Sequence, residues 1–204
     1  MKKVFLTGAS SGIGKACLEL LQHHYEITAP TRDQFNLEQF GAVSTFDYSP
    51  YDIVINCAGV NVGTHLGFHK NNYQNQVQQV HVNYIAPLLM AKKYTQDRKS
   101  GQFIFISSGS IDKPEVYNIF NSTSKLALRQ AMHTLGKEYN TILFTEICPG
   151  RTKTNMLYQN YNGTKTCDEV ELEYAQYPCL TADNVAESVL YSITNRISEI
   201  KINP

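Results

Sequence analysis

A glycine-rich segment near the N-terminus limits what this chain can fold into more than any other feature. Lys3–Thr7 is a short apolar run, and Ile13–His23 carries apolar residues at helical spacing. Between them, Gly8 permits a tight turn, Gly12 lets backbone approach a pyrophosphate, and Gly14 allows close packing of helix on strand. The segment predicts a strand–turn–helix unit whose free N–H groups face a bound dinucleotide. The spacing G-x-x-x-G-x-G differs from the generic dinucleotide fingerprint, and a glycine turn without a ligand is the alternative.

Strand-like and helix-like patterns alternate along the rest of the chain. Continuous apolar runs such as Ile53–Cys57 and Phe103–Ser107 are typical of parallel strands covered on both faces. The order predicts an α/β fold with a doubly wound, Rossmann-like parallel sheet, in one domain over residues 1–204. Ligands bind at the carboxyl ends of strands in such sheets. The other expected strands are Lys3–Thr7, Tyr25–Ala29, Leu143–Cys148 and Glu199–Ile202, and the expected helices are Ile13–His23, Asn72–Tyr94, Asn118–Tyr139 and Ala182–Asn195.

The segment between the second expected strand and Ile53 is short. Arg32–Asp52 would have to hold a helix, a strand and their turns if the sheet followed the usual six- or seven-strand plan. We therefore predict a shortened second and third strand region, in which a crossover helix is lost and Phe35-Asn36-Leu37 forms a minimal strand.

Composition excludes several classes of function. The 204 residues include 18 Lys and Arg and 18 Asp and Glu, so the net charge is zero and gives no general attraction to nucleic acid or anionic membranes. The apolar runs are too short for a membrane span, and the first one is too short for a signal peptide. Five cysteines without a C-x-x-C pair favour a reduced, cytoplasmic protein with no metal site. We expect a small-molecule substrate and neither nucleic acid nor membrane as a partner.

Further motifs follow the glycine turn in a consistent order. They are Asn56-Cys57-Ala58-Gly59, Val82-Asn83 with Pro87, Ile106-Ser107-Ser108, Ser124-Lys125, and Pro149-Gly150 followed by Thr154 and Met156. Together with the glycine turn they resemble the short-chain dehydrogenase/reductase superfamily over nearly the whole chain. Each motif is weak alone, but six in register are a specific signal.

The resemblance implies a nicotinamide cofactor. In that family the residue after the second strand selects NAD when it is Asp; here it is Thr31, followed by Arg32. A guanidinium can pair with a 2′-phosphate, so we expect NADP to be preferred over NAD. A solvated Arg32, partly neutralised by Asp33, is the alternative. The other cofactor contacts that the resemblance implies are Gly8, Ser10, Ser11, Gly12, Ile13, Gly14, Asn36, Leu37, Asn56, Ala58, Gly59, Lys125, Pro149, Gly150, Thr152 and Thr154.

The active-site motif departs from the family pattern at one position. The resemblance assigns catalytic roles to Ser108, Lys125 and Asn83, but the position of the family's tyrosine, four residues before Lys125, holds Asn121. A carboxamide has no titratable proton near neutral pH, and loss of a general acid costs about 10²–10⁴ in rate. Tyr117, one turn before Asn121, is a candidate for a relocated donor. Tyr158, Tyr161, His65 and His69 are weaker candidates for contact with substrate.

Two functions remain open. The first is an atypical NADP(H)-dependent oxidoreductase that reduces a carbonyl or quinone-like small molecule, with weakened proton donation. The alternative is an inactive NADP(H)-binding sensor or interaction module. Pro87 lacks an N–H for the carbonyl of Asn83, so we expect a kink beside the site. Residues 155–180 are expected to form the substrate loop. The long helices around Asn83 and Lys125 resemble those that form family dimers and tetramers, which predicts a homo-oligomer.

Overall fold

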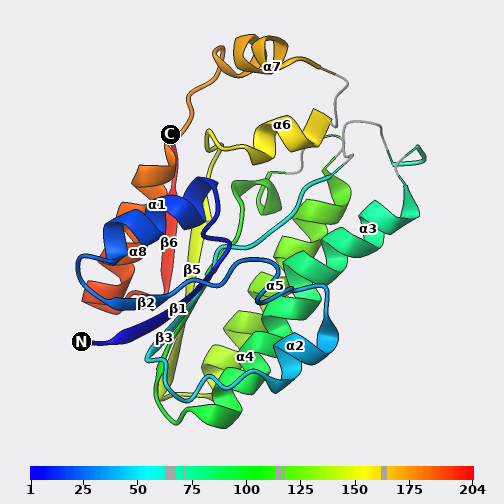
Figure 1. Cartoon of the computed structure of the whole chain (residues 1–204). Helices are drawn as coiled ribbons and strands as arrows, with labels where there is room; N and C mark the ends of the chain where they lie inside the picture. The colour runs from blue at the N-terminus through cyan, green and yellow to red at the C-terminus, as the bar shows by residue number, and fades with distance from the viewer. Residues whose placement is uncertain (63–67, 71, 114–115, 117, 162–164) are drawn as a thin grey trace.

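The six described strands of the chain form one parallel sheet. The computed structural model describes residues 1–62, 68–70, 72–113, 116, 118–161 and 165–204. The strands lie in the order β2-β1-β3-β4-β5-β6 (Figure 1), so the direction of the winding reverses between β1 and β3. This arrangement confirms the predicted doubly wound fold, and it puts the ligand crevice at the carboxyl ends of β1 and β3. The strands are β1 Lys3–Thr7, β2 Glu26–Thr28, β3 Ile53–Asn56, β4 Gly101–Ile106, β5 Ile142–Pro149 and β6 Glu199–Ile202.

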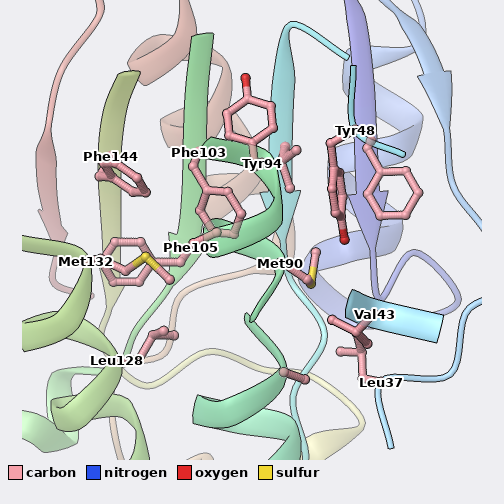
Figure 2. Packing of buried hydrophobic residues seen from close by; sticks show 14 of the residues in the cluster. Leu37, Val43, Tyr48, Met90, Tyr94, Phe103, Phe105, Leu128, Met132 and Phe144 are labelled. Carbon is pink, nitrogen blue, oxygen red and sulfur yellow. The ribbon is translucent and has the colours of Figure 1, made fainter. Parts of the chain in front are cut away.

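Helices cover both faces of the sheet. The helices α1 (Gly12–Leu21) and α8 (Ala182–Asn195) pack together on one face, whereas α2 (Phe40–Thr45), α4 (Ala86–Asp97) and α5 (Ile119–Glu138) lie over the other (Figure 1). Side chains alternate along each strand, so the two faces differ in chemistry. The α1/α8 face buries mainly aliphatic side chains, and the α4/α5 face carries aromatic ones. Figure 2 shows Phe103, Phe105 and Phe144 on the α4/α5 face, with Met132 and Leu128 beside them.

The predicted strand Phe35-Asn36-Leu37 is wrong, and so is the predicted loss of the crossover helix. The three residues lie in successive turns, with Phe35 N–H donating to the carbonyl of Thr31 at 3.0 Å, and the crossover is retained as the short helix α2. Local turns supply the backbone bonds that a strand would have taken from β2. The buried side chains of Phe35 and Leu37 anchor the segment, and Leu37 lies beside Val43 near Met90 (Figure 2).

The long helical pattern before β4 is interrupted by a π-helical turn. Helix α3 (Tyr73–Val80) runs into the turn His81–Ile85, and α4 continues from Ala86. The Ala86 N–H donates to the carbonyl of His81, five residues back. Pro87 follows at once and has no N–H to return to Asn83. The interruption therefore lies where the missing proline donor was expected to disturb the helix, and it contains Asn83.

The predicted substrate segment contains two short helices, α6 (Met156–Tyr161) and α7 (Cys167–Tyr174). Both lie at the end of the molecule where the C-terminus emerges (Figure 1). Helix α7 begins with a capping box between Thr166 and Glu169. Across the described ranges, none of the helices combines the length and the apolar character that a bilayer crossing requires.

Candidate cofactor and active site

The glycine turn is packed too tightly to admit side chains. Gly8 has φ +77°, and a Cβ there would lie 2.6 Å from the backbone nitrogen of Ala58. A Cβ on Gly14 would lie 2.1 Å from the carbonyl oxygen of Gly8. Gly12 has φ +54°, and a Cβ there would lie 3.3 Å from the Cβ of Thr154. The turn thus presents bare backbone, as the predicted close approach to a pyrophosphate requires.

The start of α1 is open to an external acceptor. Ser11 is the N-cap residue, but its side chain makes no capping hydrogen bond, and the first turn of α1 carries no acidic side chain. Both Ser10 and Ser11 are exposed. The first N–H groups of a helix have no partner within it and favour a negative charge. The chain supplies no such charge in this turn, so the position suits a phosphate.

The carboxyl ends of β1 and β3 are joined by side chains. Thr7 Oγ1 donates to Asn56 Oδ1 at 2.9 Å, and the Ala58 N–H donates to Thr7 Oγ1 at 3.4 Å. Asn56 is 1% exposed, and its Nδ2 has no hydrogen-bond partner in the described part of the chain. A buried amide donor without a partner is costly. The orphaned Nδ2, together with the bare glycine turn, fits a site whose polar ligand completes the bonding.

Asn83 ties the loop after β3 to the π-helical turn. Its Nδ2 donates to the carbonyl of Val60 at 2.7 Å, and its Oδ1 accepts from the Val60 N–H at 2.8 Å. The same Nδ2 lies 3.4 Å from Oδ1 of Asn121 on α5. Asn83 therefore holds the predicted cofactor loop and contacts the residue at the tyrosine position.

Lys125 is a buried cation one turn after Asn121. It is 7% exposed, and its Nζ donates to the carbonyl of Ile106 at 2.7 Å. A Cβ on Gly59 would lie 3.5 Å from that nitrogen. Burial lowers the pKa of Lys125 to about 8, and among the described residues no carboxylate pairs with its ammonium. The structure thus brings Lys125, Gly59, Asn83 and Asn121 together, four residues that the family resemblance assigns to the cofactor and active site.

Ser108 caps the 3₁₀ turn Gly109–Ile111 that follows β4. Its Oγ accepts from the Ser110 N–H at 3.2 Å and lies 2.8 Å from Ser110 Oγ. Gly109 packs against the segment after β5, because a Cβ there would lie 3.4 Å from Gly150 Cα. The half-buried hydroxyl of Ser108 thus faces a neighbouring hydroxyl at the sheet end that carries Pro149-Gly150.

The residues predicted to select the cofactor lie on the surface beyond β2. Thr31 and Arg32 are exposed, and the guanidinium of Arg32 pairs with Glu38, not with the adjacent Asp33. Gln78 Nε2 also donates to Glu38, at 3.0 Å. Nearby, Asn36 Oδ1 accepts from the Glu38 N–H at 2.9 Å, and the side chain of Leu37 lies in the core.

The segment with the predicted cofactor contacts Thr152 and Thr154 is held by the chain before α8. Thr152 forms a parallel bridge with Leu180, and the Lys153 N–H donates to the Leu180 carbonyl at 2.9 Å. Thr152 Oγ1 donates to the carbonyl of Gly150 at 2.9 Å. These bonds fix the path of the backbone that carries Thr154 toward Gly12.

The structure describes three of the four further candidates for contact with substrate. Tyr117 and His65 lie outside the described residues. The Tyr158 hydroxyl bonds to Glu171 of α7, and this bond raises the pKa of Tyr158. Tyr161 is buried, and His69 is exposed in a turn. Tyr158 thus belongs to the contact between α6 and α7.

Two groups of contacts were not anticipated from the sequence. Arg151 lies over the rings of Tyr174 and Tyr177, 5.2 and 4.4 Å from their centroids. Arg129 of α5 bonds to Glu146, a carboxylate within β5. The sequence signal for the second group is a charged residue inside a mostly apolar strand, since a buried carboxylate needs a partner.

Comparison with known proteins gives consistent results. A family model described as short chain dehydrogenase matches residues 24–165. An uncharacterised oxidoreductase of Staphylococcus epidermidis is 25% identical, with 100% of this chain and 97% of that protein covered. An NADP-dependent 3-hydroxy acid dehydrogenase of Schizosaccharomyces pombe is also 25% identical, over 96% of this chain and 88% of its own. A serine dehydrogenase solved in a closed form with NADP⁺ superposes with a TM-score of 0.85, at 19% identity, covering 99% and 94% of the two chains.

Proposed function

The chain belongs to the short chain dehydrogenase family and is an oxidoreductase of that type, and from this premise we propose an NADP(H)-dependent enzyme that reduces a carbonyl or quinone-like small molecule. The observation that carries the proposal is the meeting of two groups at the carboxyl end of the sheet. One is the side-chain-free glycine turn at Gly8, Gly12 and Gly14. The other is the buried set of Asn83 and Lys125, which contact the loop after β3.

The residues present fit a nicotinamide dinucleotide. The backbone of the glycine turn and the start of α1 would hold its pyrophosphate, and the orphaned Nδ2 of Asn56 and the ammonium of Lys125 offer donors to its polar groups. When bound, the cofactor supplies or accepts the hydride. The protein binds and orients both reactants and controls the proton.

Ser108 and Lys125 have different roles toward the substrate: Ser108 supplies a hydrogen bond and Lys125 a positive charge. The Ser108 hydroxyl, in the turn that follows β4, would donate a hydrogen bond to the substrate oxygen that gains negative charge on reduction. The Lys125 ammonium has no carboxylate partner among the described residues, so its positive charge is available to the same region. Its pKa near 8 means that at neutral pH it holds a proton and gives it up readily.

Asn121 changes the source of the proton. Its carboxamide cannot transfer one, so the reduced oxygen takes its proton from Lys125 Nζ or from water. An electron-poor carbonyl or a quinone needs the least assistance of this kind. The substitution therefore favours such acceptors over simple ketones.

Preference for NADP rests on Arg32. Its exposed guanidinium offers two parallel donors to a 2′-phosphate. The name of the S. pombe relative, an NADP-dependent enzyme, agrees with this choice. The ion pair with Glu38 opposes it, because a bound phosphate has to compete with a carboxylate for the same guanidinium.

One observation favours a different function, an NADP(H)-binding sensor or interaction module without turnover. Asn121 Oδ1 lies 3.4 Å from Nδ2 of Asn83, so the side chain at the tyrosine position bonds inward. A module that only binds the cofactor would keep the glycine turn and Lys125 and would not require a proton donor.

A turnover assay separates the two functions. The purified protein is incubated with NADPH and a panel of quinones, diketones and aldehydes, and the loss of reduced nicotinamide is followed by absorbance. We expect oxidation of NADPH with quinones and diketones, and much less with Lys125→Ala. Equal rates for the two proteins would refute the enzymatic proposal. NADPH binding without any turnover would support the sensor.

We also propose that the protein assembles as a dimer or tetramer through the long helices. Leu126 and Ile119 of α5 are each 48% exposed, which leaves apolar surface on that helix. Sedimentation of the wild-type protein and of Leu126→Glu tests this proposal. A monomeric wild-type protein would contradict it.

A further inference from the structure

We propose that Glu146 and Arg129 are positioning residues, which hold the turn carrying Ser108 in register with Lys125 on α5. The inference rests on the proposed function, because Ser108 and Lys125 act there on the same substrate oxygen. Neither Glu146 nor Arg129 belongs to the motifs that predicted the site. The proposal starts from the position of Glu146 within the sheet.

Glu146 is a carboxylate in the middle of a buried strand. It is 0% exposed and lies on β5, on the same face as Ile142 and Phe144, which pack under α5. A buried charge of this kind is costly unless it is paired and hydrogen-bonded. Arg129 Nε donates to its Oε1 at 2.7 Å, and His133 Nε2 lies 3.2 Å from its Oε2.

The same carboxylate holds the residue before Ser108. The Ser107 hydroxyl donates to Glu146 Oε1, and the Ser107 N–H donates to the carbonyl of Ile147 at 2.8 Å. Ser107 is buried, so its hydroxyl has no bulk water as an alternative partner. Glu146 therefore fixes the point at which the chain leaves β4 and enters the turn.

Arg129 holds the other end of that turn. Its Nη1 donates to Asp112 Oδ1 at 2.8 Å, and Lys201 Nζ lies 3.0 Å from Asp112 Oδ2. Burial opposes the charge of Arg129, but the bonds to Glu146 and Asp112 outweigh it and raise the pKa of the guanidinium. One planar guanidinium thus links β5 to the end of the turn, a geometry that a lysine ammonium cannot reproduce.

Helix α5 therefore fixes the turn on both sides. Lys125 Nζ donates to the carbonyl of Ile106, and Arg129, one helical turn later, reaches Glu146 and Asp112. Residues four apart on a helix lie on the same face. The two polar residues of the helix and the serine turn are consequently positioned as one unit.

Glu146, Arg129 and the side chains that they contact, Ser107, Asp112 and His133, form one polar cluster. A metal site is a second interpretation of part of this cluster. Ligand atoms of His133, Glu146 and Glu199 all lie within 4.8 Å of one another. However, Arg129 pairs with Glu146, and Lys201 lies 3.6 Å from Glu199, so the chain already supplies cations to both carboxylates. We therefore assign the cluster to positioning.

The test removes the link between the cluster and the turn while leaving the ion pair. In Ser107→Ala, we expect kcat/KM for the carbonyl or quinone substrate to fall by about tenfold or more, because small displacements of positioned groups are costly. The Kd for NADPH, measured by titration, should be unchanged, since the glycine turn lies on other strands. Amide hydrogen exchange should quicken in residues 106–113 and not in residues 8–14.

Matched variants make the result specific. Ser192 is also fully buried, on α8 beneath the opposite face of the sheet, and Ser192→Ala should change neither kcat/KM nor exchange in residues 106–113. Ser107→Thr retains a hydroxyl and should therefore keep most of the wild-type kcat/KM. Arg129→Lys keeps the positive charge but loses the planar guanidinium, so its kcat/KM should fall.

Two outcomes overturn the inference. A lower Tm for Ser107→Ala with unchanged kcat/KM and unchanged exchange in residues 106–113 would show a purely structural contact. Full activity in Arg129→Lys would remove the role of the guanidinium. If the wild-type protein binds NADPH without turnover, the proposed function fails separately, and the exchange experiment still decides whether the cluster holds the turn.

Discussion

The guanidinium of Arg32 forms an ion pair with the carboxylate of Glu38, six residues further along the chain. The cation expected to receive a 2′-phosphate thus already has an anionic partner. Both side chains lie on the turns between β2 and α2, which replace the expected third strand. The missing strand therefore bears on the proposed preference for NADP, because these turns bring Glu38 back to Arg32.

We predict that Glu38→Gln strengthens the preference for NADPH over NADH. Removing the carboxylate frees Arg32 for the phosphate, and because exposed ion pairs are weak, the gain in NADPH affinity should be about two- to fivefold. Fluorescence titration with both cofactors measures the ratio. Arg32→Ala should lower NADPH affinity and leave NADH affinity unchanged. Equal affinities for the two cofactors in all three proteins would exclude the phosphate pairing.

Asn121→Tyr should raise activity toward simple aldehydes and ketones. The phenol restores a proton donor next to Lys125, which is worth about 10²–10⁴ in rate. Asn121→Phe is the matched control, because it adds the same ring without the hydroxyl. Steady-state rates with NADPH compare the three proteins. A gain shared by Tyr and Phe would point to packing rather than proton transfer.

Lys125 should make stability depend on pH. Its pKa is lowered by burial to about 8, from an ordinary value of 10.5 in the unfolded chain. Between these values the unfolded chain binds more protons than the folded one, so the free energy of unfolding rises with pH across this window. The rise attributable to Lys125 is about 3 kcal/mol.

Urea unfolding measures that contribution in the wild type and in Lys125→Met, each at about pH 7 and about pH 10. The contribution of Lys125 is the difference between the two proteins in how much the free energy of unfolding changes with pH. Other groups titrate in both proteins, so their effects cancel in the comparison. The variant should lose the rise that Lys125 supplies. Parallel slopes for the two proteins would mean that the folded-state pKa of Lys125 is not lowered.

Gly14→Ala should weaken both the fold and dinucleotide binding. Its Cβ would lie 2.1 Å from the carbonyl oxygen of Gly8, so the backbone of the turn has to move. Overpacking of this kind costs about 1–3 kcal/mol. Gly41→Ala is the control, since no atom of the described ranges lies within 4 Å of its Cβ position on α2. Thermal unfolding with and without NADPH distinguishes them, and equal ligand-induced shifts would contradict the role of the glycine turn.

Local signals in the sequence were sufficient for most of the framework. The sequence pattern predicts a helix over Ala182–Asn195 and a final strand over Glu199–Ile202, and the structure has both at these bounds, with Thr181 capping the helix. Capping and apolar periodicity act between residues a few positions apart, so the sequence displays them directly. The same holds for the glycine turn, whose residues contact one another.

Phe35-Asn36-Leu37 shows where such signals fail. Two apolar residues around a polar one fit a short strand, yet a strand also needs a neighbour to bond with, and here local turns satisfy the backbone instead. Burial of Phe35 and Leu37 was predictable from their chemistry. The conformation that buries them was decided by the core formed with Phe5 and Met90.

The sequence alone therefore determined the class of fold, the glycine turn and the absence of tyrosine at position 121. Each of these features depends on neighbouring residues or on a fixed spacing along the chain. Only the tertiary structure decided that Arg32 pairs with Glu38 and that Glu146 connects Ser107 to Arg129. It also decided that the Nδ2 donor of Asn56 has no partner among the residues described. The contacts of Glu146 with Arg129 and Ser107 join residues 17 and 39 positions apart. The partner of a buried polar atom depends on which strands and helices pack together. Chain folding, rather than local pattern, selects those partners.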